Sequence, residues 1–226
     1  MRPHPETLQP YDDRRAAGAD LASRLGAYAN RDDVVVLALP RGGVPVAFEI
    51  ATALGVLLDI FLVRKLGVPS QPELAMGAIA SGGVRVLNDE VVSWYGIDPQ
   101  SIDEVARREQ TELDRREREY RQGRAPAALQ GMTVILVDDG LATGSTMKAA
   151  VQAVRAHAPS RVVVAVPVGA PDTCLALAAL SDEVVCARTP ALFSAVGLWY
   201  RDFSQTTDDE VRELLERSRA FAAKEK

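Results

Sequence analysis

Near the middle of the chain lies the segment Val134-Ile135-Leu136-Val137-Asp138-Asp139-Gly140-Leu141-Ala142-Thr143-Gly144-Ser145-Thr146. It begins with an apolar run, continues with two adjacent carboxylates and ends in a loop of small residues. The run 134–137 has the length and the β-branched content of a buried strand. Apolar residues recur at helical spacing after Ser145, which predicts a helix beginning at the small-residue loop. The segment therefore predicts a strand, a tight turn and a helix in succession.

The loop and the two acids together indicate a site for a phosphorylated sugar. Residues 143–146 would present backbone N–H groups and hydroxyls at a helix N-terminus, where unpaired donors and the helix dipole attract phosphate. Asp138 and Asp139 would stand beside that phosphate as acceptors, which suits the vicinal hydroxyls of a ribose 5-phosphate. The loop is not a Walker A motif, because no Lys follows Gly144. The alternative interpretation is a capped strand–turn–helix corner with acidic residues at the sheet edge.

Residues 138–146 resemble the phosphoribosyl-diphosphate (PRPP) binding motif of the type I phosphoribosyltransferases. The resemblance covers about residues 34–205, and the chain as a whole looks most like uncharacterised bacterial predicted phosphoribosyltransferases. It implies an Mg²⁺-dependent enzyme of nucleotide metabolism that transfers the 5-phosphoribosyl group of PRPP to a nitrogen base and releases diphosphate. It also implies that Asp138 and Asp139 are catalytic and hold the metal indirectly, through ribose or water. The residues that would bind the 5-phosphate are Ala142, Thr143, Gly144, Ser145 and Thr146.

A second segment of the same kind precedes this one in the chain. Residues 34–39 predict a buried strand, Pro40-Arg41-Gly42-Gly43 a sharp turn, and a helical pattern runs to about Leu54. An ordinary turn with a solvated Arg41 is the alternative, but ligands of open α/β sheets bind at the carboxyl ends of strands. In the family that the chain resembles, this turn is the diphosphate loop. The resemblance places Arg41, Gly42 and Gly43 on the diphosphate, makes Arg41 catalytic, and puts a non-proline cis peptide at Pro40–Arg41.

The apolar run 57–63 predicts a further strand, which ends in Arg64-Lys65. Two cations at a strand's carboxyl end are either ordinary surface charge or further contacts to the diphosphate. Adenine-type phosphoribosyltransferases have a similar Arg-Lys step, so the resemblance assigns Arg64 and Lys65 to diphosphate binding.

An inserted region of about residues 66–130 follows. Its turn-rich start, 67–73, precedes two apolar runs, 75–80 and 84–87, which predict a hairpin. In the resembled fold this region is the mobile loop that closes over the reacting centre. A long charged helix over about 98–122 comes next, with a thin apolar stripe. It is either a solvated face or the contact of a homodimer.

The remaining pattern alternates strands and helices, with strands at 161–167 and 183–187 around a short helix at 171–180. Such alternation predicts an α/β fold with a mainly parallel sheet flanked by helices. We expect a single domain over 1–226: a core of about 30–188, a small C-terminal hood of about 189–205 and a last helix of about 207–223.

Aromatic side chains cluster in the hood at Phe193, Trp199, Tyr200 and Phe203. They form either a satellite hydrophobic cluster or a wall on which a flat base stacks, with Phe193 and Trp199 as the stacking residues. The motif gives conflicting signals on the base. Ala142 stands where enzymes for 6-oxopurines usually carry Asp, which is closer to the adenine and orotate types, yet the hood faintly resembles the 6-oxopurine enzymes. The base stays unassigned.

The composition narrows the class further. The net charge of −5 argues against nucleic acid as the main partner, and no apolar run is long enough to span a membrane. Residues 1–10 have no apolar signal-peptide core, so we expect a cytoplasmic protein. Cys174 and Cys186 have no metal-type spacing and do not suggest a disulfide framework, so buried thiols are the expectation. Two hypotheses besides a base transferase stay open: a PRPP-sensing regulator, and a PRPP-using enzyme with a non-base acceptor.

Overall fold

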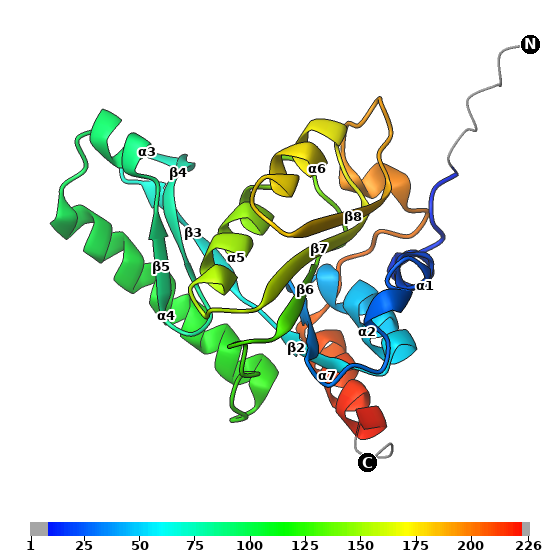
Figure 1. Ribbon diagram of the computed structural model, residues 1–226. Helices are drawn as coiled ribbons and strands as arrows, with labels where there is room; N and C mark the ends of the chain where they lie inside the picture. The colour runs from blue at the N-terminus through cyan, green and yellow to red at the C-terminus, as the bar shows by residue number, and fades with distance from the viewer. Residues whose placement is uncertain (1–8, 223–226) are drawn as a thin grey trace, which may run out of the picture.

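The computed structural model describes residues 9–222, and its core is a five-stranded parallel sheet (Figure 1). Every neighbouring pair of strands in this sheet is parallel. The predicted α/β class is confirmed. In spatial order the strands are β2 (Leu57–Ile60), β1 (Val34–Ala38), β6 (Thr133–Val137), β7 (Arg161–Val168) and β8 (Glu183–Arg188).

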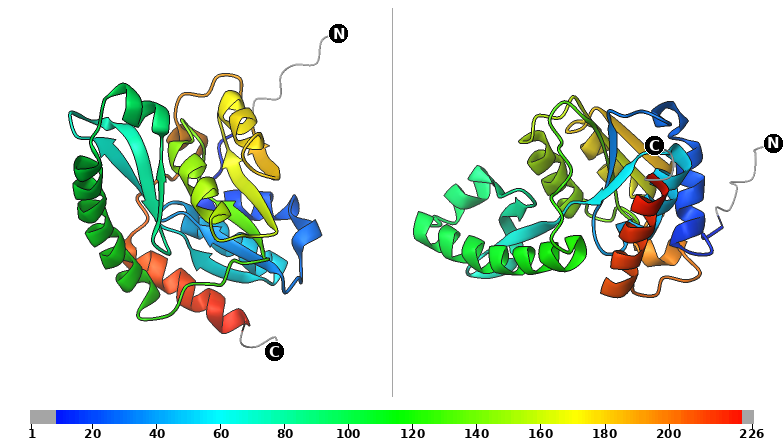
Figure 2. Two further views of the ribbon diagram at one scale, coloured as in Figure 1. Left: turned by 60° about the vertical axis from the view of Figure 1, so that its left-hand side comes forward. Right: turned by 90° about the horizontal axis from the view of Figure 1, so that it is seen from below.

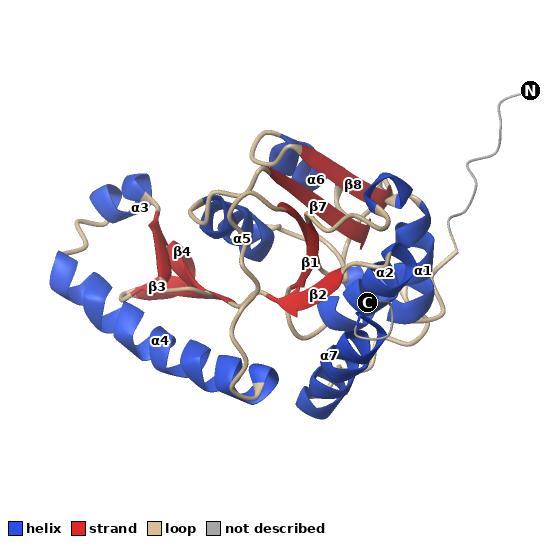
Figure 3. Ribbon diagram, turned by 60° about the horizontal axis from the view of Figure 1, so that its bottom comes forward, coloured by secondary structure: helices blue, strands red, loops and turns tan. Residues whose placement is uncertain are grey.

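Helices cover both faces of this sheet (Figure 3). Along β6, Ile135 and Val137 pack into one apolar cluster, and Val134 and Leu136 into another. The first cluster lies under α1 (Arg14–Ser23), α2 (Gly43–Leu54) and α7 (Asp208–Ala222), and the second under α5 (Ser145–Arg155) and α6 (Pro171–Ala178). Burial on both faces explains why the strands are continuous runs of Val, Ile and Leu instead of alternating patterns.

The inserted region forms a lobe of its own, which extends away from the core sheet (Figures 1 and 2). A three-stranded antiparallel sheet makes one side of it, and α3 (Asp89–Trp94) and α4 (Pro99–Arg121) follow. Its strands are β3 (Val63–Val68), β4 (Gln71–Ala80) and β5 (Val84–Leu87). The predicted hairpin is confirmed as the β4–β5 pair.

The strand expected over 57–63 ends earlier than predicted. β2 stops at Ile60, and after two residues the chain enters the second sheet as β3, where Leu66 and Val68 pack with the apolar stripe of α4. Arg64 and Lys65 therefore lie within β3, not at the carboxyl end of a core strand. Because α4 buries its stripe against its own lobe, its exposed face is the charged one; the homodimer contact stays a prediction.

A buried ion pair ties the lobe to the core. Arg121, the last residue of α4, donates from Nη1 to both carboxylate oxygens of Asp59 at 2.7 and 2.6 Å. Its Nη2 donates to the Ile60 carbonyl oxygen at 2.9 Å, and the Ala127 N–H donates to Asp59 at 2.8 Å. Both Asp59 and Arg121 are 5% exposed. The lobe is thus anchored at the edge strand β2.

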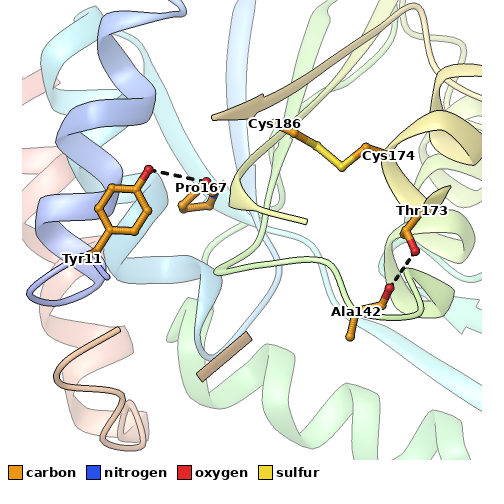
Figure 4. The surroundings of a disulfide bond; sticks show 6 residues. All are labelled: Tyr11, Ala142, Pro167, Thr173, Cys174 and Cys186. Carbon is orange, nitrogen blue, oxygen red and sulfur yellow. Dashed lines mark hydrogen bonds between the residues drawn. A yellow bond between two sulfur atoms is a disulfide. The ribbon is translucent and has the colours of Figure 1, made fainter. Parts of the chain in front are cut away.

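The two cysteines form a disulfide, which corrects the expectation of buried free thiols (Figure 4). Cys174 lies in the first turns of α6 and Cys186 in β8, and α6 packs on β8 so that the two Cα atoms are 6.9 Å apart. Twelve residues separate the pair in the sequence, so only the packing of this helix on this strand brings them together.

The start of the described chain lies beside the hood. The Tyr11 N–H donates to the Trp199 carbonyl oxygen at 2.8 Å, and the Arg201 N–H donates to the Tyr11 carbonyl oxygen at 2.8 Å. The first helix, α1, begins at Arg14 and ends at Ser23, and residues 26–28 form a separate 3-10 turn. Within residues 9–222 no helix has the length and apolar character needed to cross a membrane.

Candidate functional site

The two predicted ligand loops meet at the carboxyl ends of β1 and β6. These strands are adjacent and parallel, so the turn at 40–43 and the acids that follow Val137 share one edge of the sheet. A Cβ at Gly42 would lie 2.0 Å from Oδ2 of Asp139, and a Cβ at Gly43 would lie 2.6 Å from the Val137 carbonyl oxygen. Close approach of the backbone therefore requires glycine at position 43, and a side chain at position 42 would displace the Asp139 carboxylate. The peptide Pro40–Arg41 is cis, as predicted.

The acid pair lies in an environment that disfavours two negative charges. Burial raises the pKa of the Asp138 carboxyl well above its ordinary value, and the charge of Asp139 raises it further. Burial also raises the pKa of Asp139, against the opposing effect of the Arg14 guanidinium, whose Nε donates to Oδ2 at 2.8 Å. Asp138 Oδ1 accepts from the Asp139 N–H at 2.9 Å. Burial thus disfavours ionisation of both acids, and a hydroxyl donor or a cation at the site would favour their charged forms.

The small-residue loop is open to solvent. Gly144 stands before α5 with φ of +69°, a left-handed conformation that favours glycine, and a Cβ there would lie 2.5 Å from Cγ2 of Thr173. The Thr173 hydroxyl donates to the Ala142 carbonyl oxygen at 2.7 Å and holds the loop from the side of α6 (Figure 4). The side chains of Ala142, Thr143, Ser145 and Thr146 are exposed. An anion can therefore reach the N-terminus of α5.

The hood closes the site from the other side. The Tyr200 hydroxyl donates to the Asp139 carbonyl oxygen at 2.6 Å, and the Phe203 ring stacks on the Tyr200 ring with centroids 5.1 Å apart. Val196 covers Gly140 so closely that a Cβ at Gly140 would lie 2.5 Å from a Val196 methyl carbon. Gly140, Val196 and Phe203 therefore form one side of the space next to the acid pair.

The two residues expected to stack a base pack within the hood itself. Phe193 and Trp199 are half-buried and pack against a small apolar cluster of Tyr11, Ala17, Val168 and Tyr200. This is the satellite cluster that the sequence left open as the alternative. Base stacking by Phe193 and Trp199 stays a prediction.

The predicted cations do not converge on the acid pair. Arg41 lies 3.6 Å from Asp208 at the start of α7. Arg64 donates from Nε to Glu109 on α4 at 2.7 Å, and Lys65 lies 3.9 Å from Glu73. Arg64, Lys65 and Arg108 instead line a cleft of about 600 Å³ between the inserted lobe and α5, and Thr146 of the small-residue loop lines the same cleft.

Three site residues were missed by sequence reasoning: Arg14, Tyr200 as a partner of the acid pair, and Phe203 as a partner of Arg14. The aromatic cluster was noticed, but its members could not be assigned to the two sides of the hood. Nothing near Arg14 in the sequence distinguishes it from its neighbour Arg15, because its partner is 125 residues away.

Comparisons with known proteins show the family of the chain. The phosphoribosyl transferase domain family matches residues 7–188, so the chain belongs to that family. It is 54% identical over 213 residues to "Putative phosphoribosyl transferase Rv0571c" of Mycobacterium tuberculosis strain H37Rv, and equally to the corresponding protein, MT0597, of strain CDC 1551. The match covers 94% of this chain and 48% of each relative, so the chain spans about half the length of these curated relatives.

A solved structure has the same fold. The crystal structure of TT1426 from Thermus thermophilus superposes with a TM-score of 0.84 and is 44% identical in sequence. The match covers 92% of this chain and 99% of that one, so it includes the inserted lobe as well as the core. The lobe is therefore a shared feature of these two proteins.

Proposed function

We propose that the protein transfers the 5-phosphoribosyl group of PRPP to a nitrogen base and releases diphosphate. The observation that supports this most strongly is the exposed, helix-capping loop 143–146 next to an acid pair that touches the glycines of the turn at 40–43. The loop 143–146 would hold the 5-phosphate, the acid pair the ribose hydroxyls and the turn at 40–43 the diphosphate. The proposal treats the chain as a single domain with a core, a hood and an inserted lobe.

The residues would act mainly by binding and orienting charge. Residues 143–146 would bind the 5-phosphate through backbone N–H groups and hydroxyls at the start of α5. Asp138 and Asp139 would accept hydrogen bonds from the two ribose hydroxyls, which fixes the sugar while the bond from C1 to the diphosphate breaks. Positive charge that develops on the sugar would be stabilised by the same carboxylates.

The diphosphate would lie against the turn at 40–43, where Gly42 and Gly43 allow the backbone to come close. Arg41, Arg64 and Lys65 would offset its charge, which requires each to leave its carboxylate partner, Asp208, Glu109 or Glu73. Arg64 and Lys65 would act from the inserted lobe across the cleft that Thr146 also lines. The lobe would then act as the loop that covers the reacting centre.

The site's donor set fits Mg²⁺. This ion binds carboxylate oxygens together with waters and substrate phosphates, and the acid pair supplies two adjacent carboxyl groups. Asp138 and Asp139 would hold the ion indirectly, through ribose hydroxyls or water. When bound, Mg²⁺ would neutralise charge on the diphosphate.

A non-base acceptor is the second candidate, and one observation favours it. The hood's Phe193, Val196 and Trp199 all pack against the cluster that contains Tyr11 and Tyr200, and Val196 also covers Gly140 next to the acid pair with an apolar side chain. Such a wall has few groups that would read the edge of a base.

The experiment is to incubate the protein with Mg²⁺ and PRPP, add a panel of purines, pyrimidines and other nitrogen bases one at a time, and measure diphosphate release. Release that depends on one base supports the transferase. Release that is equal with and without every base supports PRPP hydrolysis, and PRPP binding without release supports a regulator. Asp139→Ala should abolish PRPP binding by calorimetry while circular dichroism stays unchanged; unchanged affinity would reject the ribose assignment.

A further inference from the structure

Arg14 contacts the acid pair from outside both ligand loops. It is the first residue of α1, and its side chain is 11% exposed against 16% for its partner Asp139. Nε donates to Asp139 Oδ2 at 2.8 Å, and Nη1 donates to the Ser204 carbonyl oxygen at 2.7 Å. The guanidinium thus joins the acid pair to the hood with two directed hydrogen bonds.

An aromatic side chain holds the guanidinium in place. The Cζ atom of Arg14 lies 4.0 Å from the centroid of the Phe203 ring and 5.9 Å from that of Tyr200. Arginine over an aromatic face is attracted by the ring electrons. The planar guanidinium is also the cation best suited to donate to a carboxylate and a carbonyl oxygen while it stacks on an aromatic ring.

Electrostatics explains why this cation is needed. Asp138 and Asp139 are adjacent and poorly solvated, and a carboxylate in such a place is costly unless it is paired and hydrogen-bonded. Among the side chains that the structure describes, Arg14 is the cation that forms an ion pair with either acid. Its Nε takes one oxygen, Oδ2, which leaves Oδ1 of Asp139 for a ligand.

We propose that Arg14 is a positioning residue of the sugar site, which holds the Asp139 carboxylate in the orientation that the ribose hydroxyls require. This inference rests on the proposed function. Because Arg14 is also fastened to Ser204 and Phe203, the position of the hood and the orientation of the ribose anchor are coupled through one side chain. Among the described residues no hydrogen bond or ion pair joins Arg14 to residues 142–146, so binding of the 5-phosphate should not depend on it.

The test compares Arg14→Met, Arg14→Lys and the control Arg15→Met, which removes an exposed arginine from the neighbouring position. Affinities for ribose 5-phosphate and for inorganic phosphate are measured by calorimetry and by phosphorus NMR, without any acceptor. We expect Arg14→Met to bind ribose 5-phosphate roughly tenfold more weakly, the loss of one hydrogen bond to a charged group, while its affinity for inorganic phosphate is unchanged. Arg14→Lys should lie between Arg14→Met and the wild type, because lysine keeps the charge but not the two-armed geometry.

Three results would overturn the proposal. Equal weakening of ribose 5-phosphate and inorganic phosphate would mean that Arg14 acts only through general attraction of anions or through the fold. Unchanged ribose 5-phosphate affinity in Arg14→Met would mean that Asp139 needs no partner. Tighter binding in Arg14→Met would mean that Arg14 competes with the sugar for the carboxylate.

A second variant links the hood to the same measurement. Phe203→Leu removes the ring under the guanidinium, so it should weaken ribose 5-phosphate binding in the wild type but not in the Arg14→Met background. If Phe203→Leu and Arg14→Met have additive effects on the affinity for ribose 5-phosphate, the coupling is contradicted. These outcomes concern sugar-phosphate binding alone, so a chain that binds ribose 5-phosphate but transfers it to no acceptor would overturn the proposed reaction and leave the role of Arg14 intact.

Discussion

Replacing Gly42 by alanine tests the contact between the turn at 40–43 and the acid pair. The backbone of Gly42 is helical, with φ of −59° and ψ of −32°, a conformation that alanine adopts readily. Its new Cβ, however, would lie 2.0 Å from Oδ2 of Asp139, whereas ordinary contact begins at 3.4 Å. The carboxylate therefore has to move by about 1.4 Å relative to residue 42.

A movement of this size breaks directed bonds. The Arg14–Asp139 hydrogen bond of 2.8 Å cannot be kept unless Arg14 follows, and Asp139 no longer meets a ribose hydroxyl at hydrogen-bond distance. The loss of one hydrogen bond to a charged group costs roughly 1.5–3 kcal/mol, or about 10- to 150-fold in affinity. The change in stability should be smaller, because Gly to Ala at a compatible position stabilises by about 0.4–1 kcal/mol and offsets part of the strain.

Calorimetry of PRPP with Mg²⁺ measures the affinity, and urea denaturation measures the free energy of unfolding. Gly26→Ala is the matched control, because a Cβ at Gly26 meets nothing within 4 Å. We expect PRPP binding to fall in Gly42→Ala and to stay at the wild-type value in Gly26→Ala. A Gly42→Ala protein that binds PRPP as the wild type does would refute the role given to the Asp139 carboxylate in sugar binding.

Three further predictions concern other parts of the chain. Arg121→Met leaves Asp59 buried without its cation and should destabilise the protein by roughly 3–5 kcal/mol in urea denaturation; a loss below about 1 kcal/mol would contradict this. Because the pKa of Asp138 is raised, the stability linked to its protonated form is present at low pH and is lost as the pH rises through the raised pKa. Asp138→Asn should therefore stabilise the protein at neutral pH but not at a pH below the ordinary carboxyl pKa of about 3.9. An equal gain in the free energy of unfolding at the two pH values would contradict this prediction. Trp199 fluorescence should respond to the acceptor that is turned over, and no response would remove Trp199 from the acceptor site.

The central part of the site could be predicted because its causes are local. A buried strand, a turn of small residues and a helix specify their own order, and parallel strands put their carboxyl ends at one edge of a sheet. The turn at 40–43 and the acids at 138–139 were therefore expected near each other, and the contact of Gly42 with Asp139 confirms it. The cis peptide at Pro40–Arg41 followed from the family resemblance and is also confirmed.

Contacts between distant segments were beyond the reach of the sequence. The hydrophobic pattern indicates that a run such as 57–63 is buried, but it does not indicate in which sheet the run lies. The switch from β2 to β3 decides where Arg64 and Lys65 lie. The disulfide likewise depends on how α6 packs on β8.

Periodicity and motif spacing determined that this chain builds two strand–turn–helix units with small-residue turns, because those signals act over a few residues. Only the tertiary structure decided which cation forms an ion pair with the two acids. Arg14 reaches Asp139 across 125 residues, since the start of the chain pairs with the hood and brings α1 to the carboxyl edge of the sheet. The sequence does not specify which residue a charged helix side chain will pair with, because the packing of the whole fold decides it.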